Sequence, residues 1–173
     1  MAILLLLSPL LLVKLSLGLF LVFLQLPIYM LHQYEEHSQG EFKAYVNKFI
    51  ADGAEVLTDR DIFYINILLV WMLDVVVLYL ANYINLAYGL IAVYLTVLNG
   101  IFHIGMGIMK REYNPGLWTS IFMFLPVGGY SIYAINQNSN VLIMDHVIGV
   151  GITILGHAAI LIRIRQNLNK IRS

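Results

Sequence analysis

Residues 10–37 read LLLVKLSLGLFLVFLQLPIYMLHQYEEH, an almost unbroken apolar run that ends in two imidazoles and two carboxylates within six residues. The apolar character extends back to Ala2, so the run is longer than the roughly 20 residues that a helix needs to cross a bilayer. Burying ionisable side chains in a membrane is costly, so those that are found there usually serve a function. This stretch therefore predicts a membrane scaffold that is organised around a polar site beginning at His32.

The composition of the whole chain is that of a membrane protein. Of its 173 residues, 60% are hydrophobic and 12% are charged, and the mean hydropathy is +0.81, which is too apolar for one water-soluble core. Lys and Arg number 10, as do Asp and Glu, and no basic block is present, so nucleic acid is not expected as a partner. Because the chain has no Cys, its chemistry must use His, carboxylate, Asn, hydroxyl or Tyr side chains.

The hydrophobic pattern predicts an all-α membrane protein with a single transmembrane domain over residues 1–173, built as a helical bundle. Five spans are expected, at about residues 10–31, 62–81, 86–109, 117–135 and 141–162. Residues 38–60 are polar but keep apolar side chains at helical spacing, which predicts an amphipathic helix on the membrane surface. The start of the chain lacks the basic region and the cleavage site of a signal peptide, so we expect the first span to be retained.

The distribution of Lys and Arg predicts the orientation of the chain. One side of the membrane receives these residues from the first loop, the third loop and the C-terminal tail: Lys43, Lys48, Arg60, Lys110, Arg111, Arg163, Arg165, Lys170 and Arg172. The other side receives none, and Lys14 lies within the first span. We therefore expect the N-terminus outside and the C-terminus in the cytoplasm, with the His32 motif at the cytoplasmic face.

Four of the five spans bring polar side chains to one layer near that face. At a rise of 1.5 Å per residue, those on the second, third and fifth spans lie about 9 to 11 Å inside the boundary. They are Asn66, His103 and His157. His32, Glu35 and Glu36 enter the same layer from the end of the first span and share a helix face at spacings of three and four residues.

These residue types indicate metal chemistry. Imidazole and carboxylate are ligands of zinc and of non-haem iron, and a divalent cation lowers the cost of burying them. The predicted ligands are His32, Glu36, His103 and His157. Glu35 and Glu36 are the candidates for catalysis, because a metal-bound water becomes a nucleophile and a spare carboxylate can act as the general base. The residues predicted to lie behind the ligands and orient them are Asn66, Asn99 and Tyr113.

Other polar residues have structural interpretations. Asp74 lies in the outer half of the second span at a depth that Lys14 could reach, so we expect a buried ion pair between them. His146, beside Asp145 near the outer end of the fifth span, is expected to be a cap or a packing residue. The segment 113–116 reads as a turn, with the gating of a substrate path as the alternative.

Three short motifs together resemble one protein family. His32-Gln33-Tyr34-Glu35-Glu36 resembles the motif that names the HXXEE-domain family of small membrane proteins. Asn99-Gly100-Ile101-Phe102-His103 resembles the Asn-x-x-x-His pattern of that family, and Tyr113-Asn114-Pro115-Gly116 with Thr119 resembles the turn that follows it. The resemblance extends from about Pro27 to His157. The family is largely of unknown function, so the resemblance implies a membrane protein with a metal or catalytic site and supplies no substrate.

These observations predict an intramembrane metal-dependent enzyme. We favour a zinc-type hydrolase of a lipid or another hydrophobic substrate, open to the cytoplasmic leaflet. The adjacent Glu35 and Glu36 leave open a non-haem iron or di-iron oxidoreductase. A third interpretation is a metal or proton carrier, or a small binding protein, in which Asp74, Asp145 and His146 continue the polar path outward.

The expected cofactor is a divalent transition metal, with zinc favoured over iron. The expected partners are the lipid bilayer and a hydrophobic small molecule or lipid as substrate. Glycine-rich faces on the third and fifth spans allow packing within one chain or between the chains of a homodimer. A phosphate-binding loop, a serine nucleophile motif and a dinucleotide fingerprint are missing, so ATP, NAD and FAD have no support in the sequence.

Overall fold

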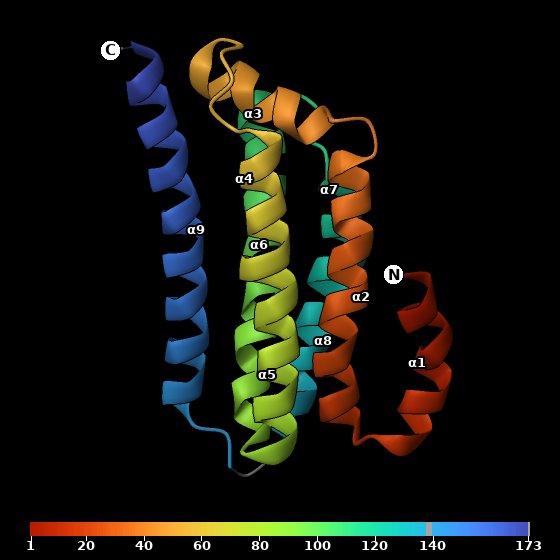
Figure 1. The fold of residues 1–173 in the computed structure, drawn as a ribbon. Coiled ribbons are helices and arrows are strands. Elements are labelled where there is room, and N and C mark those ends of the chain that lie inside the picture. The colour runs from red at the N-terminus through yellow and green to blue at the C-terminus, as the bar shows by residue number, and fades with distance from the viewer. Residues whose placement is uncertain (138–139, 173) are drawn as a thin grey trace.

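The structure, a computed structural model, describes residues 1–137 and 140–172, and every regular element in these ranges is a helix. Five helical segments are long and apolar enough to cross a membrane, and they pack side by side as a bundle (Figure 1). They are Leu17–His37, Asp59–Tyr83, Leu86–Lys110, Leu117–Asn136 and Ile143–Arg172. The all-α fold and the five candidate spans expected from the sequence are thus confirmed.

Three of the five segments change their helical geometry along their length. The second consists of α4 (Asp59–Tyr64), the π-helix η1 (Ile65–Trp71) and α5 (Met72–Tyr83). The third consists of the 3-10 helix η2 (Leu86–Gly89) and α6 (Leu90–Lys110). The fourth consists of α7 (Leu117–Thr119), the π-helix η3 (Ser120–Phe124) and α8 (Leu125–Asn136). The first is α2 (Leu17–His37) and the fifth is α9 (Ile143–Arg172). π-helical turns are rare and occur often at functional sites, which draws attention to η1 and η3.

The first apolar run is divided into two helices. α1 (Ala2–Lys14) ends just before Ser16, whose hydroxyl accepts a hydrogen bond from the Leu19 amide (3.3 Å) at the start of α2. α1 folds back beside α2 (Figure 1), and its 13 residues are fewer than a span requires. The helix that carries the His32 motif thus begins at Leu17 and not near residue 10, because a serine cap stabilises a new helix start within the apolar run.

α3 (Glu41–Ala51) lies across the end of the bundle at which α2 and α9 terminate (Figure 1). It corresponds to the predicted surface helix but is shorter than residues 38–60. Asp52 and Gly53 adopt φ values of 51° and 93°, which end the helix. A buried apolar cluster then connects this region to α9: Ala51, Val56, Leu57 and Ile164.

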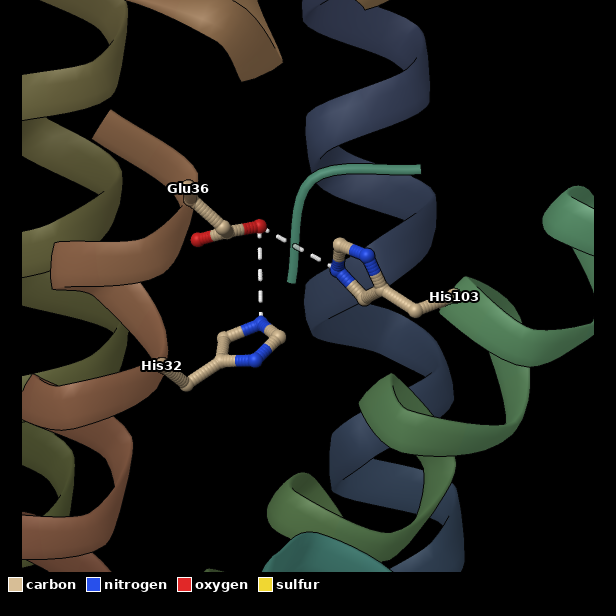
Figure 2. Close-up of side chains that lie close together, drawn as sticks. All are labelled: His32, Glu36 and His103. Atoms are coloured by element: carbon tan, nitrogen blue, oxygen red, sulfur yellow. Dashed lines mark ion pairs between the residues drawn. The ribbon is translucent and has the colours of Figure 1, made fainter. Parts of the chain in front are cut away.

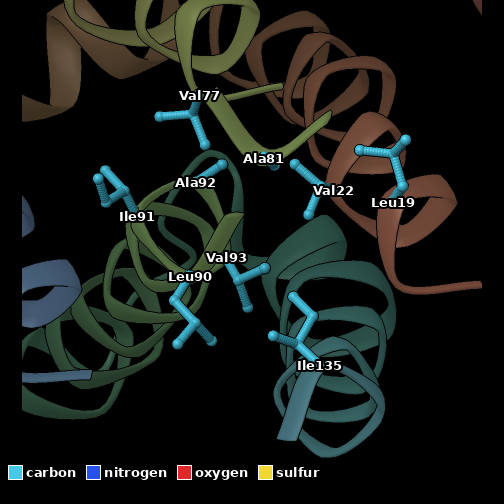
Figure 3. Packing of buried hydrophobic residues seen from close by; sticks show 9 residues of the cluster. All are labelled: Leu19, Val22, Val77, Ala81, Leu90, Ile91, Ala92, Val93 and Ile135. Carbon is cyan, nitrogen blue, oxygen red and sulfur yellow. The ribbon is translucent and has the colours of Figure 1, made fainter. Parts of the chain in front are cut away.

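The main hydrophobic core lies in the half of the bundle far from α3 and joins α2, α5, α6 and α8 (Figure 3). Its buried members are Leu19, Val22, Val77, Ala81, Leu90, Ile91, Ala92, Val93 and Ile135. α9 packs on α6 beside this core, where a Cβ atom at Gly149 would lie 3.1 Å from the Leu90 carbonyl oxygen. The glycine therefore permits the two backbones to approach closely within one chain.

Asp61 connects the beginning of α4 to α9 by several hydrogen bonds. Its Oδ1 accepts from Arg163 Nε (2.8 Å), and its Oδ2 accepts from Asn167 Nδ2 (3.0 Å) and Thr58 Oγ1 (2.7 Å). The Asp61 side chain is only 6% exposed. Removing it would leave these donors without their shared acceptor, which is costly where water does not replace it.

We expect Asp61→Ala to lower the free energy of unfolding by about 2 kcal/mol, because two neutral donors and one partly exposed Arg lose their acceptor. For a chain of this length, that loss lowers the thermal midpoint by roughly 4 to 8 °C. Asp59→Ala is the matched control, since the Asp59 side chain is 85% exposed and pairs with Lys43 at the surface. Thermal unfolding in detergent measures both variants, and equal midpoints would contradict the role given to Asp61.

Candidate metal centre

Two imidazoles and one carboxylate converge inside the bundle near the end covered by α3 (Figure 2). Glu36 Oε1 lies 3.5 Å from His32 Nε2 and 3.1 Å from His103 Nε2, and the three side chains are at most 8% exposed. One donor atom of each residue lies within 4.8 Å of the donor atoms of the other two. We call His32, Glu36 and His103 the triad.

The spacing of the triad fits a first-row divalent metal. Zn–N and Zn–O bonds of about 2.0 to 2.1 Å in a tetrahedral site place neighbouring ligand atoms roughly 3.3 Å apart. The Glu36 oxygen lies 3.1 and 3.5 Å from the two imidazole nitrogens, which brackets this value. Two of the three distances between donor atoms thus match a tetrahedral site, and all three lie within 4.8 Å.

Local helix geometry explains why these residues meet. His32 and Glu36 are four residues apart on α2, so their side chains lie on the same face, one turn apart. α6 packs against α2 and supplies His103, whose ring stands edge-on to that of His32 with centroids 4.7 Å apart. Two helices thus suffice to form the triad.

Glu35 points away from the triad, because adjacent residues on a helix do not share a face. Its carboxylate lies at the start of the fourth span and accepts from the Trp118 amide (3.0 Å), the Thr119 amide (2.8 Å) and Tyr113 Oη (2.7 Å). Burial and the bond to Glu35 raise the pKa of the Tyr113 phenol, so this group remains a hydrogen-bond donor at neutral pH. Glu35 therefore joins α2 to the fourth span.

Thr119 connects Glu35 to the triad. Its hydroxyl lies 2.8 Å from His32 Nδ1 and donates to Glu35 Oε2 (2.5 Å), with the Gly116 carbonyl oxygen at 3.2 Å as the other acceptor. Because both other neighbours of the hydroxyl only accept, the hydroxyl oxygen must accept from His32, and Nδ1 carries the proton. The lone pair of His32 is then on Nε2, the nitrogen that faces Glu36. This is the tautomer that a metal ligand requires.

A turn closes the site from the side of the fourth span. Gly116 has φ of 94°, and a Cβ atom there would lie 2.6 Å from His32 Cε1 and 3.0 Å from His103 Cε1. Asn114 fastens the turn to α6, since its Nδ2 donates to the His103 carbonyl oxygen (3.1 Å). The segment 113–116 is thus a turn, as expected, and its backbone covers both imidazoles. Only glycine combines this φ with so close an approach.

His157, predicted as a ligand, does not join the triad. Its Nδ1 donates to the Thr153 carbonyl oxygen (2.9 Å), and its Nε2 lies 3.4 Å from Asn99 Oδ1. Asn99 stands between the two histidines, with its Nδ2 donating to His32 Nε2 (3.1 Å). Asn99 therefore contacts the same nitrogen of His32 that faces Glu36, and this hydrogen bond must break if an ion binds that nitrogen. His157 lies on the other side of Asn99.

Two other predicted relations differ from the structure. Asn66 does not contact the triad but lines a hollow on the other side of α2 with His37 and Trp71. Asp74 forms no ion pair with Lys14: the carboxyl group is 3% exposed and has no hydrogen-bond partner among the described residues, whereas Lys14 is exposed. α1 folds back beside α2 instead of continuing it (Figure 1), so Lys14, the last residue of α1, is exposed outside the bundle.

The polar residues at the far end of α9 have structural partners. His146 Nδ1 lies 2.8 Å from Tyr94 Oη, and its Nε2 lies 2.9 Å from Asn136 Oδ1. Asp145 Oδ2 accepts from the Leu142 amide (2.8 Å). These contacts agree with a capping and packing role.

The contacts of Thr119 and Asn114 at the site were not predicted from the sequence. Gly116 was predicted only to be part of a turn. The signal available was small: a Pro-Gly pair that opens an apolar span, with a threonine three residues later. A hydroxyl at that distance falls in the first turn of a helix, where its backbone amide and side chain can both bind one carboxylate.

Comparison with known proteins gives one family. A family model described as a protein of unknown function with an HXXEE motif matches residues 23–131. No curated protein and no solved structure matches the chain. The matched segment includes the triad together with Glu35, Asn99 and Thr119, and it ends before His157.

Proposed function

The chain belongs to the HXXEE family of proteins of unknown function, and we propose that it is a membrane-embedded metal-dependent enzyme, a zinc-type hydrolase of a lipid or other hydrophobic substrate. The observation that carries the proposal is the convergence of His32, Glu36 and His103, whose donor atoms lie within 4.8 Å of one another in the interior of the bundle. Outside a metal or proton site, so many polar groups in one buried place are costly.

The triad is the ligand set of a known class of catalytic zinc site. Two His and one Glu leave the fourth position of a tetrahedral site for water. A bound zinc would supply a water of lowered pKa as the nucleophile and would polarise a carbonyl oxygen. The chain itself contributes the buried ligands, the fixed tautomer of His32, and the turn at Gly116 that keeps bulk water from the imidazoles.

The two adjacent Glu have different proposed roles. Glu36 is the ligand, because its Oε1 lies between the two imidazoles. Glu35 has its two oxygens engaged by Tyr113, Trp118 and Thr119. We assign it a positioning role, in which it acts on His32 through the Thr119 hydroxyl. This arrangement supports a centre for one metal, since a carboxylate-bridged pair would need both Glu at the ions.

Two further features support activity at the cytoplasmic leaflet. The triad lies toward the end of the bundle covered by α3, where the C-terminus also lies (Figure 1), and the first loop and the C-terminal tail contain basic residues. Basic residues near span ends favour the cytoplasmic side. A hydrophobic substrate would then reach the centre from the inner leaflet.

Elemental analysis by mass spectrometry tests the proposal on protein purified in detergent. We expect about one zinc per chain in the wild type and its loss in His103→Ala. His146→Ala is the matched control, because this histidine bonds to Tyr94 and Asn136 away from the triad and its loss should leave the metal content unchanged.

Three results would change the conclusion. Wild-type protein without a stoichiometric metal, even after incubation with zinc, would overturn the metal centre. Equal loss of metal in His103→Ala and His146→Ala would mean that the ion is bound elsewhere or lost by unfolding. Iron in place of zinc, with an absorbance change that depends on oxygen, would replace the hydrolase by an oxidoreductase, for which two His and one carboxylate are also a known set.

A further inference from the structure

A hollow surface follows the side of α2 that faces away from the turn at Gly116. It consists of two adjoining depressions of about 500 and 370 Å³, which share His37, Asn66 and Trp71 as lining residues. One lies against α4 and η1, and the other continues along α2 past Gln33. We call the two depressions together the lateral groove.

Gln33 presents a hydrogen-bond donor that nothing in the described chain accepts. Its Oε1 accepts from Trp71 Nε1 (2.6 Å), and because an indole nitrogen can only donate, this bond fixes the orientation of the amide. Its Nε2 is buried and has no hydrogen-bond partner among the described residues, and Gln33 is only 6% exposed, so a ligand atom must insert from the groove to reach it. Buried donors are normally satisfied, so an acceptor from a ligand is expected here.

Much of the wall of the lateral groove is apolar and belongs to segments that can cross a membrane, while Met1 and Ser38 line the smaller depression from outside those segments. Ile62, Phe63 and Ile67 line the larger depression, and Met30 lines the smaller one. Ile67 and Trp71 lie on η1, so a π-helix forms part of the wall. Such a surface suits a hydrocarbon chain that enters sideways from the bilayer.

The lateral groove meets the triad at one carboxylate. His37 lines both depressions, and its Nε2 lies 3.5 Å from Glu36 Oε2. The other oxygen of Glu36 faces His32 and His103. A molecule in the lateral groove would therefore lie on the outer side of the same group that we assign as a metal ligand.

We propose that the lateral groove binds one acyl chain of a neutral membrane lipid, with the ester carbonyl oxygen accepting a hydrogen bond from Gln33 Nε2. Because the amide N–H can only donate, the ligand must offer an acceptor atom, and a cation cannot bind here. No Lys or Arg side chain is among the described residues that line the groove, and its two charged groups, the Met1 amino group and the Asp59 carboxylate, have opposite signs, so an uncharged ester fits better than a free fatty acid. Binding of the lipid in the groove does not depend on the proposed function. Only the identification of this lipid as the substrate rests on it.

Quenching of tryptophan fluorescence tests this proposal in detergent. The chain has two Trp, so Trp118→Phe leaves Trp71 in the groove as the only reporter. The probes are a monoacylglycerol with a dibrominated stearoyl chain and its ether analogue, which lacks the carbonyl oxygen. We expect saturable quenching by the ester with about tenfold tighter binding than the ether, and loss of this preference in Gln33→Leu.

The controls separate the two proposals. Ile67→Phe in the Trp118→Phe background places bulk in the groove and keeps Trp71 as the reporter, and we expect it to weaken quenching by the ester while the metal content stays unchanged. All quenching is measured after treatment with a chelator. Saturable binding in protein that never holds metal would support the groove and refute the metal centre. Equal binding of ester and ether, or an ester preference that survives in Gln33→Leu, would overturn the groove proposal whatever the metal content.

Discussion

Replacing Gly116 with Ala should weaken metal binding and destabilise the fold, although the change adds a single methyl group. A Cβ atom at this position would lie 2.6 Å from His32 Cε1 and 3.0 Å from two atoms of the His103 ring. The rings must move apart to admit it, and their donor atoms then no longer converge on Glu36. We expect metal affinity to fall at least tenfold, in the range known for disturbed ligand orientation.

The cost in stability of Gly116→Ala has two sources. A residue with Cβ costs about 1 to 2 kcal/mol in the left-handed region, and the crowded site adds about 1 to 3 kcal/mol from overpacking. Gly40→Ala provides the matched control, because Gly40 also has a positive φ (71°) but has no atom within 4 Å of the added methyl group. Elemental analysis and thermal unfolding in detergent measure both variants.

The comparison has a clear negative outcome. If Gly40→Ala and Gly116→Ala lower the thermal midpoint equally and neither loses metal, the turn does not press on the imidazoles, and the assignment of a closed centre is wrong. If Gly116→Ala loses much stability but keeps its metal, the turn is important for folding and does not control the positions of the two imidazoles.

The second large effect is expected for Thr119→Val, which keeps the shape of the side chain and removes its hydroxyl. His32 Nδ1–H and one oxygen of Glu35 then lose the group that joins them. The proton on Nδ1 then has no acceptor, so the His32 tautomer with its lone pair on Nε2 is less favoured. We expect metal affinity to fall 10- to 100-fold and the free energy of unfolding to fall by about 1 to 3 kcal/mol, because a buried donor is left unsatisfied.

Thr96→Val is the matched control for this change. Thr96 is fully buried, whereas Thr119 is partly buried, and the Thr96 hydroxyl donates to the Ala92 carbonyl oxygen (3.2 Å) within its own helix, away from the triad. Thr119→Ser should restore metal affinity, since it returns the hydroxyl without the methyl group. Titration with zinc measures all three variants, and equal affinities for the two valine variants would show that the Thr119 hydroxyl does not orient His32.

Much of the fold follows from one physical quantity, the length of each apolar run. A run that must satisfy its backbone inside a membrane becomes a helix, and five such segments are present in the structure. The exception is the first run, where a serine at position 16 starts a new helix inside an apolar sequence. Hydropathy averages over a window and cannot detect a single capping side chain.

The sequence predicts how deep each site residue lies along its span but not the direction in which its side chain points. His32 and Glu36 share a face by helical spacing, and His103, expected at a similar depth on the third span, lies beside Glu36. His157 was placed at a similar depth, yet its ring turns toward Asn99 instead of Glu36. The angle through which each helix is rotated about its own axis depends on packing between helices, and the sequence of one span does not contain it.

The choice between Glu35 and Glu36 depends on the same rotation. Successive residues on a helix point about 100° apart, so one of the two must face the interior partner and the other must face a neighbour. The packing of α2 between α6 and the fourth span decides that Glu36 meets His103 and that Glu35 meets Thr119. A chain with two equal carboxylates in sequence thus gives them unequal surroundings.

The ligands come from the first and third spans and the cover from the turn before the fourth, which has a consequence for how the protein is made. His32 and Glu36 emerge during synthesis with the first span, His103 arrives with the third, and the covering turn arrives only before the fourth. An ion that needs all of these groups cannot be held by a partly inserted chain. It would bind the completed bundle alone and stabilise it by about 2.7 kcal/mol at a hundredfold excess over the dissociation constant. Supply of the ion would then set how long each newly made copy survives in the membrane.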